Sequence, residues 1–575
     1  MDRRNFLGRV ALGGGILASS SFYSCLSPSG SKEGNRLVQI DSATGELNAD
    51  IVIAGAGMGG CAAAMSALKH GLTVVMTEET DWIGGQLTQQ IVPVDEHPWI
   101  NTHGAPASYR RFRNLVRDYY KRNYPVIEEE MANENFNPGK GFVSNFCFEP
   151  KVGLQILQDM LAPYISAGKL VLLLEHKAVS ADMEGAEVKA LRVRNSRTGN
   201  VVTLKAPYFV DATEIGDLLP LTGTEYVTGT ESKEETGELH APEKGDPTNE
   251  QAFTMCFILD YVPGEDWTIK RPEEYDFWRD YAPQMKQPWI GKLLDLSYSN
   301  PRTLEPRTLD FHPEGINQNG RMNWWNYRKI IDRKTYEPGF FKSDLTIVNW
   351  PQNDYLLGRI IDVDDATFKH HVDRAKQLSL SLVYWLQTEV PRPDGGKGWP
   401  GVRLRCDAVG TDDGLAKYPY IREARRIKSL FTVKEEHVGV EQRSQITGVK
   451  DGVKCADFFD SVGVGSYSID LHPTTGGDNY LDCPSLPFQI PLGALLPVRT
   501  KNLLPANKNI GTTHITNGCY REHPTEWGVG EAVGALVAFS LQRNVLPRDV
   551  RADKGMLKEF QDMLHAQGVE TKWPD

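Results

Sequence analysis

The sequence predicts an α/β protein. We expect a three-layer, Rossmann-like cofactor domain built from discontinuous segments, with an inserted α+β domain. Residues 49–79 follow the order strand, glycine-rich turn, helix, strand and acid. A later segment, "YFVDAT", reads as a buried strand of the same sheet, and "KNLLPANKNIGTTHIT" resembles a further return to it. Continuous apolar runs of this kind are typical of parallel strands that are covered on both faces.

The turn within residues 49–79 has the spacing of a dinucleotide-binding loop, Gly-x-Gly-x-x-Gly. The first glycine permits the tight turn, the second lets the backbone approach a pyrophosphate, and the third lets helix and strand pack closely. The start of the helix then offers N–H groups to the phosphates. An acid ends the second strand at about the distance expected of a ribose-binding carboxylate. The predicted cofactor contacts here are Gly55, Gly57, Met58, Gly59, Gly60 and Glu78.

Residues 1–36 have the composition of a targeting segment and a linker. Arg3 and Arg4 precede a weakly apolar, Gly- and Ala-rich stretch, which resembles a twin-arginine export signal. The alternatives are an ordinary secretory signal or an amphipathic start that is never cleaved. A Ser/Gly/Pro-rich tether follows Cys25, so this cysteine is a candidate lipid anchor. We therefore expect a periplasmic or cell-envelope protein that contacts a membrane only through Cys25.

Periodicity predicts the elements that follow the first unit. Helices are expected at 101–125, 149–168 and 523–544, and a single strand at 169–183. Residues 186–213 have the alternation of a β-meander that returns as the strand "YFVDAT".

Changes in composition set the predicted domain boundaries. The middle of the chain is rich in Trp, Tyr, Pro and Asn and lacks clean periodicity. We expect a first part of the cofactor domain at 47–224, an inserted substrate domain at 225–484, a return segment at 485–545 and a helical tail at 546–575.

Charge and cysteine content exclude several classes of protein. The net charge is −12 without a long basic run, so nucleic acid is not an expected partner. Eight cysteines without a CxxC pair indicate neither a disulfide framework nor a zinc site. The adjacent His370 and His371 cannot share a helix face, so no metal site is predicted.

Three later segments favour FAD over NAD as the dinucleotide. "ETDWIGGQLT", "FVDATEIGDL" and "EWGVGEAVG" resemble segments of the glutathione-reductase-like flavoproteins. This likeness implies a paired-Gly contact, a second FAD motif and a helix N-terminus that faces the flavin. Glu214 replaces the final Gly of the second motif, and "PANKNIG" lacks the Gly-Asp pair of many relatives. The implied contacts are Gly84, Gly85, Gln86, Ala212, Thr213, Gly528, Val529 and Gly530.

Further motifs resemble an FAD-dependent oxidoreductase family, of which some members carry the label "xanthan lyase". The matching strings run through most of the chain after the tether: "DWIGGQ", "DATEIGDL", "EYVTGTES", "NWPQNDY", "YIREARR" and "DSVGVGSYSIDLHP". The resemblance implies bound FAD and says little about the substrate.

Oxidation of a C–H bond by a flavin needs a base and donors that hold the substrate. His523 precedes the helix expected to face the flavin, and it is the first candidate for the base. His472, in a Gly-rich turn, is the second, and Arg521 is a candidate to bind an anionic substrate or the flavin. The charges of residues 422–428 are expected on a salt-bridged helix, and "NWWNY" at 323–327 is expected in the core rather than on a sugar-stacking surface.

The sequence thus predicts an exported FAD-dependent oxidoreductase. The expected reaction is hydride transfer from an organic substrate, a carbohydrate or polyol in particular, to the flavin N5, with an external electron acceptor. One alternative is a redox-assisted glycoside hydrolase or lyase that keeps a tightly bound dinucleotide. Another is a non-catalytic flavoprotein that binds a ligand.

Overall fold

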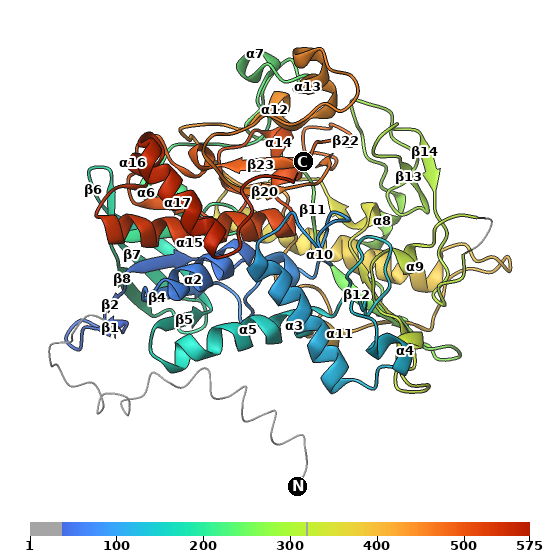
Figure 1. Cartoon of the computed structure of the whole chain (residues 1–575). Helices are drawn as coiled ribbons and strands as arrows, with labels where there is room; N and C mark the ends of the chain where they lie inside the picture. The colour runs from blue at the N-terminus through green and yellow to red at the C-terminus, as the bar shows by residue number, and fades with distance from the viewer. Residues whose placement is uncertain (1–36, 318–319, 575) are drawn as a thin grey trace, which may run out of the picture. The chain divides into compact units, whose positions relative to one another are not determined.

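A parallel sheet of five strands, ordered β24-β9-β3-β4-β5, forms the centre of the fold (Figure 1). The computed structural model describes residues 37–317 and 320–574, so the predicted signal and Cys25 lie outside the described residues. Every pairing in this sheet is parallel. The strands are β3 (Ile51–Ala54), β4 (Val74–Glu78), β5 (Leu170–Leu174), β9 (Tyr208–Asp211) and β24 (Leu503–Pro505).

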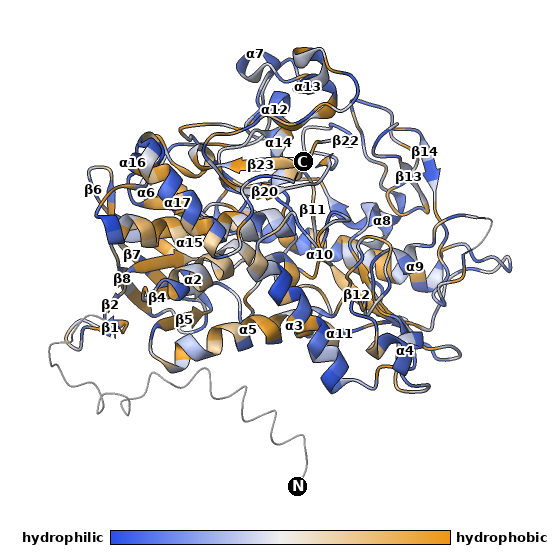
Figure 2. Ribbon diagram, in the orientation of Figure 1, coloured by the Kyte–Doolittle hydropathy of each residue, from blue (hydrophilic) through white to orange (hydrophobic). Residues whose placement is uncertain are grey.

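The two faces of this sheet belong to two different cores, which confirms the predicted three-layer architecture. In β3, Val52 and Ala54 pack against a second, meander sheet, whereas Ile51 and Ile53 pack against helices. Successive side chains of a strand point to opposite faces, so a strand buried on both faces must be apolar throughout. Figure 2 shows the strands around β4 in the hydrophobic colour, whereas the peripheral α4 (Glu128–Met131) is hydrophilic.

The meander sheet has the order β1-β2-β8-β7-β6. Its strands are β1 (Gln39–Ile40), β2 (Leu47–Asn48), β6 (His176–Glu184), β7 (Glu187–Asn195) and β8 (Val201–Lys205). The single strand predicted at 169–183 is wrong, because the chain turns at Glu175 with a φ of 60°. The residues before this turn form β5 of the parallel sheet, and those after it form β6 of the meander.

Helices cover the other face of the parallel sheet. They include α2 (Met58–Lys69), α5 (Pro150–Ser166) and α15 (His523–Arg543), and α3 (Ala107–Asn123) packs on α5. In Figure 1, α2 and α15 lie side by side. Their contact is between backbones, because a Cβ on Gly530 would lie 2.0 Å from the Gly59 carbonyl oxygen. A Cβ on Gly59 would in turn lie 1.5 Å from the Ala506 carbonyl oxygen, just beyond β24.

The predicted insertion contains an antiparallel sheet, β15-β16-β12-β18, and the long helix α10 (Asp365–Thr388). The strands are β12 (Phe257–Tyr261), β15 (Lys329–Ile331), β16 (Leu345–Val348) and β18 (Val402–Leu404). Trp324 and Trp325 of "NWWNY" are buried, as expected of core residues. Residues Leu37–Asp575 pack as one compact unit, so the boundaries of the insertion stay a prediction.

Two short antiparallel pairs carry residues of the site described below. The first pairs β11 (Phe253–Thr254) with β17 (Asp354–Tyr355), and the second pairs β21 (Ile469–Leu471) with β22 (Leu481–Cys483). A third pair, β20 (Ser461–Gly465) with β23 (Phe488–Pro491), packs on α15.

The helix predicted over residues 422–428 is wrong. This segment is extended, and its only regular element is the short strand β19 (Arg426–Ile427). Arg426 does pair with Glu423 at 3.2 Å, but most partners come from other elements: Arg422 bonds the Ala252 carbonyl, and Arg426 also pairs with Glu231. The spacing of these charges therefore predicted a helix where the chain forms a buried, extended polar segment.

The C-terminal tail is helical, with α16 (Pro547–Ala552) and α17 (Lys554–Ala566). Among the described residues, no helix combines the length and the apolar character needed to cross a bilayer.

The α2–α15 contact generates a prediction about two glycines on one helix face. Gly530→Ala should destabilise the protein by about 1–3 kcal/mol, the usual cost of overpacking, because its Cβ would overlap the Gly59 carbonyl. Gly528→Ala is the matched control, since its Cβ would first meet Ile490 at an ordinary 3.6 Å. Chemical unfolding measures both, and equal losses of stability in the two variants would contradict this account.

Candidate cofactor and active site

A cleft opens at the carboxyl ends of β3, β4 and β9, where parallel sheets bind their ligands. Gly55 has a φ of 87°, and a Cβ there would lie 2.3 Å from the Ala212 carbonyl oxygen, so both the turn and the close approach require glycine. The predicted contacts Gly55, Glu78, Ala212 and Thr213 all line this cleft. The rest of the lining is Ala54, Thr77, Glu79, Gln89, His176, Lys177, Ala178, Glu214 and Asp217.

Glu78 is tied to the glycine loop. Its carboxylate accepts the backbone N–H of Ala56 at 3.0 Å and that of Thr80 at 2.9 Å. Gln89 donates its amide to the same carboxylate at 3.1 Å. Burial, with the nearby Glu79 carboxylate, raises the pKa of Glu78 to about 8. A buried acid with spare acceptor capacity at this strand end suits a sugar hydroxyl.

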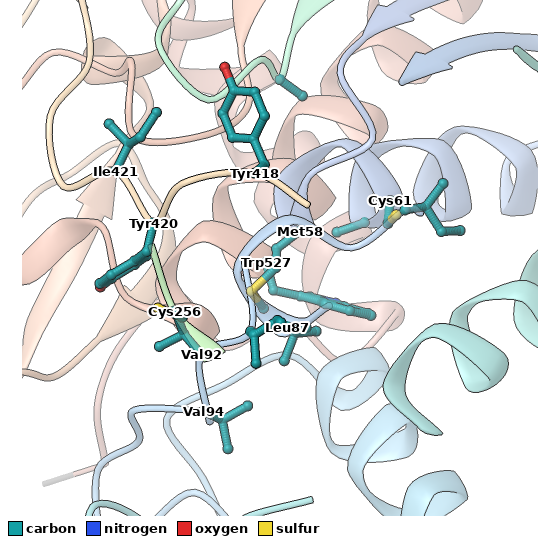
Figure 3. Packing of buried hydrophobic residues seen from close by; sticks show 14 of the residues in the cluster. Met58, Cys61, Leu87, Val92, Val94, Cys256, Tyr418, Tyr420, Ile421 and Trp527 are labelled. Carbon is teal, nitrogen blue, oxygen red and sulfur yellow. The ribbon is translucent and has the colours of Figure 1, made fainter. Parts of the chain in front are cut away.

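The second glycine segment lies on the first loop. Gly84 donates its N–H to the Ala56 carbonyl at 2.7 Å, and a Cβ on Gly85 would lie 3.0 Å from the Gly57 Cα. Gln86 then reaches the start of α15, where its amide donates to the Arg521 carbonyl at 2.8 Å. Figure 3 shows the hydrophobic side chains packed nearby, with Met58 on α2, Leu87 next to Gln86 in sequence, and Trp527 on α15.

The "DATE" motif closes the cleft from β9. Ala212 donates its N–H to the Ala54 carbonyl, and Asp211 accepts from both the N–H and the hydroxyl of Thr213. Asp211 also accepts the N–H of Leu218, which fixes the turn after the strand.

The segment Gly528-Val529-Gly530 does not form the start of its helix. α15 begins at His523, with Glu522 as its N-cap, so these three residues lie in the second turn. Gly530 packs on Gly59, and Val529 is buried. The structure therefore gives this segment a packing role and moves the helix N-terminus to Glu522 and His523.

These features fit a bound dinucleotide. The glycine cradle leaves no room for side chains, and α2 has no capping side chain at Gly57. Beyond the cradle, several fully buried polar atoms have no partner in the described protein, as expected if a ligand supplies one. These atoms are Gln86 Oε1, Gln89 Oε1, both amide atoms of Gln90, Asp95 Oδ1 and His523 Nε2.

His523 is a buried hydrogen-bond donor in this geometry. The backbone N–H of Asp95 donates to Nδ1 at 3.2 Å, which assigns the proton of the neutral ring to Nε2. Burial and the nearby Arg328 lower the pKa of His523 to about 3, so the ring stays neutral. Because its free nitrogen already carries a proton, His523 is a poor base, contrary to the role that its position suggested.

His472 has the arrangement of an oriented base. Its Nδ1 lies 2.6 Å from Asp354 Oδ2, and its Nε2 faces Asp470 Oδ2 at 3.7 Å. Asp354 is fixed in turn by the Thr254 hydroxyl at 2.6 Å and by Arg422 at 3.2 Å. Burial by itself would raise the pKa of Asp354. The nearby Arg422 and His472 together outweigh this effect and lower the pKa below its usual value, so the carboxylate is charged. The carboxylate on Nδ1 orients the ring, so Nε2, which faces Asp470, is the nitrogen placed to exchange a proton.

Arg521 joins the two histidines. Its Nη2 lies 3.4 Å from Asp470 Oδ2, the oxygen that also faces His472. Its Nη1 donates to the Tyr420 hydroxyl at 2.6 Å and lies 3.2 Å from Glu522 Oε1. The three predicted catalytic residues therefore lie in one cluster, in which His523 and Arg521 are buried, His472 is partly exposed and Arg521 is already paired.

Asp95, Glu522 and His523 present three buried ligand-type atoms within 4.8 Å of one another. Two guanidinium groups oppose a cation here, since Arg328 lies 3.6 Å from Asp95 and Arg521 pairs with Glu522. Burial raises the pKa of Glu522 to about 8 despite Arg521. A neutral group with both donors and acceptors suits this set better than a metal ion.

Sequence reasoning missed most of the partners in this cluster: Asp95, Arg328, Asp354, Tyr420 and Asp470. A signal was present for three of them. Asp354 stands in "NWPQNDY", Asp470 in "SYSIDLHP" and Tyr420 in "YIREARR", which are strings of the family resemblance.

The fold and the cleft define a dinucleotide-binding enzyme of the Rossmann-like class. Residues 50–564 match the model of the FAD dependent oxidoreductase family. The chain belongs to this family, and it is an FAD enzyme. The narrower likeness to glutathione-reductase-like flavoproteins stays a prediction, and no curated protein matches the sequence.

The solved structures that match this chain are distant. A geranylgeranyl bacteriochlorophyll reductase-like protein from Thermoplasma acidophilum is 9% identical, with a TM-score of 0.33, over 91% of this chain and 85% of that one. A p-nitrophenol 4-monooxygenase from Pseudomonas putida is 10% identical, with a TM-score of 0.33, over 92% and 90%.

The buried carboxyls predict that the flavin-free protein loses stability between pH 6.5 and 8.5. Burial raises the pKa of six acids to about 7 or 8, whereas an unfolded chain ionises them near 4. The folded state then holds more protons than the unfolded one, so stability falls as pH rises through the folded values. The acids are Glu78, Asp211, Glu238, Glu250, Glu522 and Glu526.

Thermal unfolding at the two pH values, in one buffer system at fixed ionic strength, checks this. The lower limit is 6.5 because buried neutral histidines such as His523 act in the opposite direction below it. A melting temperature that is higher at pH 8.5 would refute the prediction.

Proposed function

We propose that the protein is an exported oxidase or dehydrogenase of a neutral, hydroxyl-bearing substrate such as a sugar or polyol, and that His472 is its base. The observation that supports this most directly is the Asp354–His472 pair, which shares Asp470 with Arg521 at the start of α15. The arginine pair near the N-terminus supports export, and an external acceptor would take up the electrons.

The pairing of charges favours a neutral substrate. Arg422 is held by Asp354, Arg521 by Asp470 and Glu522, and Arg328 lies near Asp95. Each arginine of this cluster thus faces a carboxylate that compensates its charge, although Arg328 keeps Nε and Nη1 without a hydrogen-bond partner. Hydroxyl groups both donate and accept, so they match a mixture of carboxyl, imidazole and guanidinium groups.

The chain's own groups account for the proton in this reaction. When a hydroxyl-bearing carbon loses its hydride and becomes a carbonyl, the hydroxyl proton moves to His472 Nε2. The Asp354 carboxylate on Nδ1 stabilises the imidazolium that results. His523 Nε2–H would donate a hydrogen bond to a group that gains negative charge. Bound FAD supplies the two-electron acceptor for the hydride.

Anaerobic reduction of the bound flavin tests the proposed function. Among sugars, polyols and their acid derivatives, at least one neutral polyhydroxylated compound should bleach the flavin absorbance, and a carboxylic acid should not be preferred. Turnover with no external acceptor would favour the redox-assisted hydrolase or lyase instead. Absence of bleaching across the panel would favour a binding protein.

The two histidines should respond differently to the same substitution. His472→Gln removes the base and should slow flavin reduction about 10²–10⁴-fold, the usual contribution of general base catalysis. His523→Gln keeps a side-chain donor and should stay within about tenfold, since only one hydrogen bond is altered. Stopped-flow reduction of flavin-loaded variants measures both rates. A larger loss in His523→Gln than in His472→Gln would reverse the assignment of the base.

A further inference from the structure

A lysine is completely buried just beyond β24. The Lys508 Nζ lies 2.6 Å from Glu214 Oε2 and 3.8 Å from Glu526 Oε1. Burial lowers the pKa of a lysine, but these two carboxylates raise that of Lys508 above its usual value, so the ammonium group is charged. A buried ammonium is costly unless it is paired, which makes its position informative.

The partner of this lysine lies between the two glycine segments. A Cβ on Gly57 would lie 3.1 Å from Glu214 Oε1, and one on Gly85 would lie 2.8 Å from the same oxygen. Glu214 also lines the cleft at the strand ends. The carboxylate therefore stands at the start of α2, where no side chain caps the helix.

This position conflicts with the cofactor. A glycine loop at a helix N-terminus is where a dinucleotide places its pyrophosphate. Two like charges cannot occupy one buried position without a large cost, so the Glu214 carboxylate must leave when the pyrophosphate arrives. Lys508 would then lose its nearest anion and gain another in the same place.

We propose that Lys508 is the counter-ion of the FAD pyrophosphate, and that Glu214 is an exchangeable anion that holds the lysine in the flavin-free protein. In this chain a buried lysine thus adds charge to a site that glycine N–H groups and a helix dipole otherwise form. Glu214 stands where the second FAD motif of the relatives ends in Gly, and Lys508 stands in "PANKNIG". The two residues then act together.

Titration of the flavin-free, full-length protein with FAD and with ADP tests this proposal. Lys508→Met should raise the Kd for both ligands by about tenfold or more, the usual effect of losing a charge-assisted contact. ADP is included because it carries the diphosphate without the flavin. Glu214→Gln removes the competing anion and should bind FAD as tightly as the unmodified chain, or more tightly.

The double variant Glu214→Gln/Lys508→Met separates the two roles of the lysine. It contains neither charge, so it removes Glu214, the nearer of the two acids that the single Lys508→Met variant leaves unpaired and that could impair its folding. If Lys508 contacts the pyrophosphate, the double variant still binds FAD and ADP weakly. If Lys508 serves only to neutralise Glu214, the double variant regains normal affinity, and the proposal is overturned.

Lys329→Met is the matched control. Lys329 is also buried and paired with two acids, Asp332 and Asp344, but it lies outside the cleft. The Lys329→Met variant should bind FAD and ADP with unchanged Kd. A loss in Glu214→Gln as large as that in Lys508→Met would also overturn the proposal. None of these measurements involves substrate oxidation, so their outcome is independent of the proposed reaction.

Discussion

Three backbone segments touch one another directly at the junction of α2, α15 and the end of β24, and the arrangement of both sites depends on this contact. Gly59 admits the Ala506 carbonyl, and Gly530 admits the Gly59 carbonyl, at distances that a Cβ would forbid. Side chains that follow each segment are thereby brought together: Lys508 after β24, and the start of α15 beside Gln86. A site assembled from distant parts of a chain needs such a rigid centre.

The second organising feature is a set of paired charges around the start of α15. Arg328 lies near Asp95, Arg521 pairs with Asp470, and Arg422 pairs with Asp354. Such groups are expensive to bury, and their mutual pairing is what makes the burial tolerable. Once paired, they form a fixed polar environment that does not need to reorganise during a reaction.

Sequence patterns correctly predicted the features that depend on residues close together in the chain. The Gly55 loop, Glu78 at a strand end and the returning strands β9 and β24 all follow from runs and spacings, and the structure contains them. The strand predicted at 169–183 failed because the sequence around Glu175 has no Gly, Pro or Asn to mark it as a turn between two sheets. The helix predicted at 422–428 failed because, apart from the Glu423–Arg426 pair, its charges are satisfied by distant residues. The difference between His472 and His523 likewise rests on partners far along the chain, Asp354 and the Asp95 N–H.

The cofactor site is built from segments that are far apart in the sequence, so its parts are synthesised at different times. Gly55 lies near the beginning of the chain and Lys508 near its end. At roughly 5–20 residues per second, the ribosome needs on the order of half a minute to make the chain between them. From the synthesis of β9 (Tyr208–Asp211) until that of β24 (Leu503–Pro505), β9 has no partner on one side, because its neighbour β24 does not yet exist. The parallel sheet is therefore completed late in synthesis, and the free edge of β9 is the surface that a chaperone would need to shield until then.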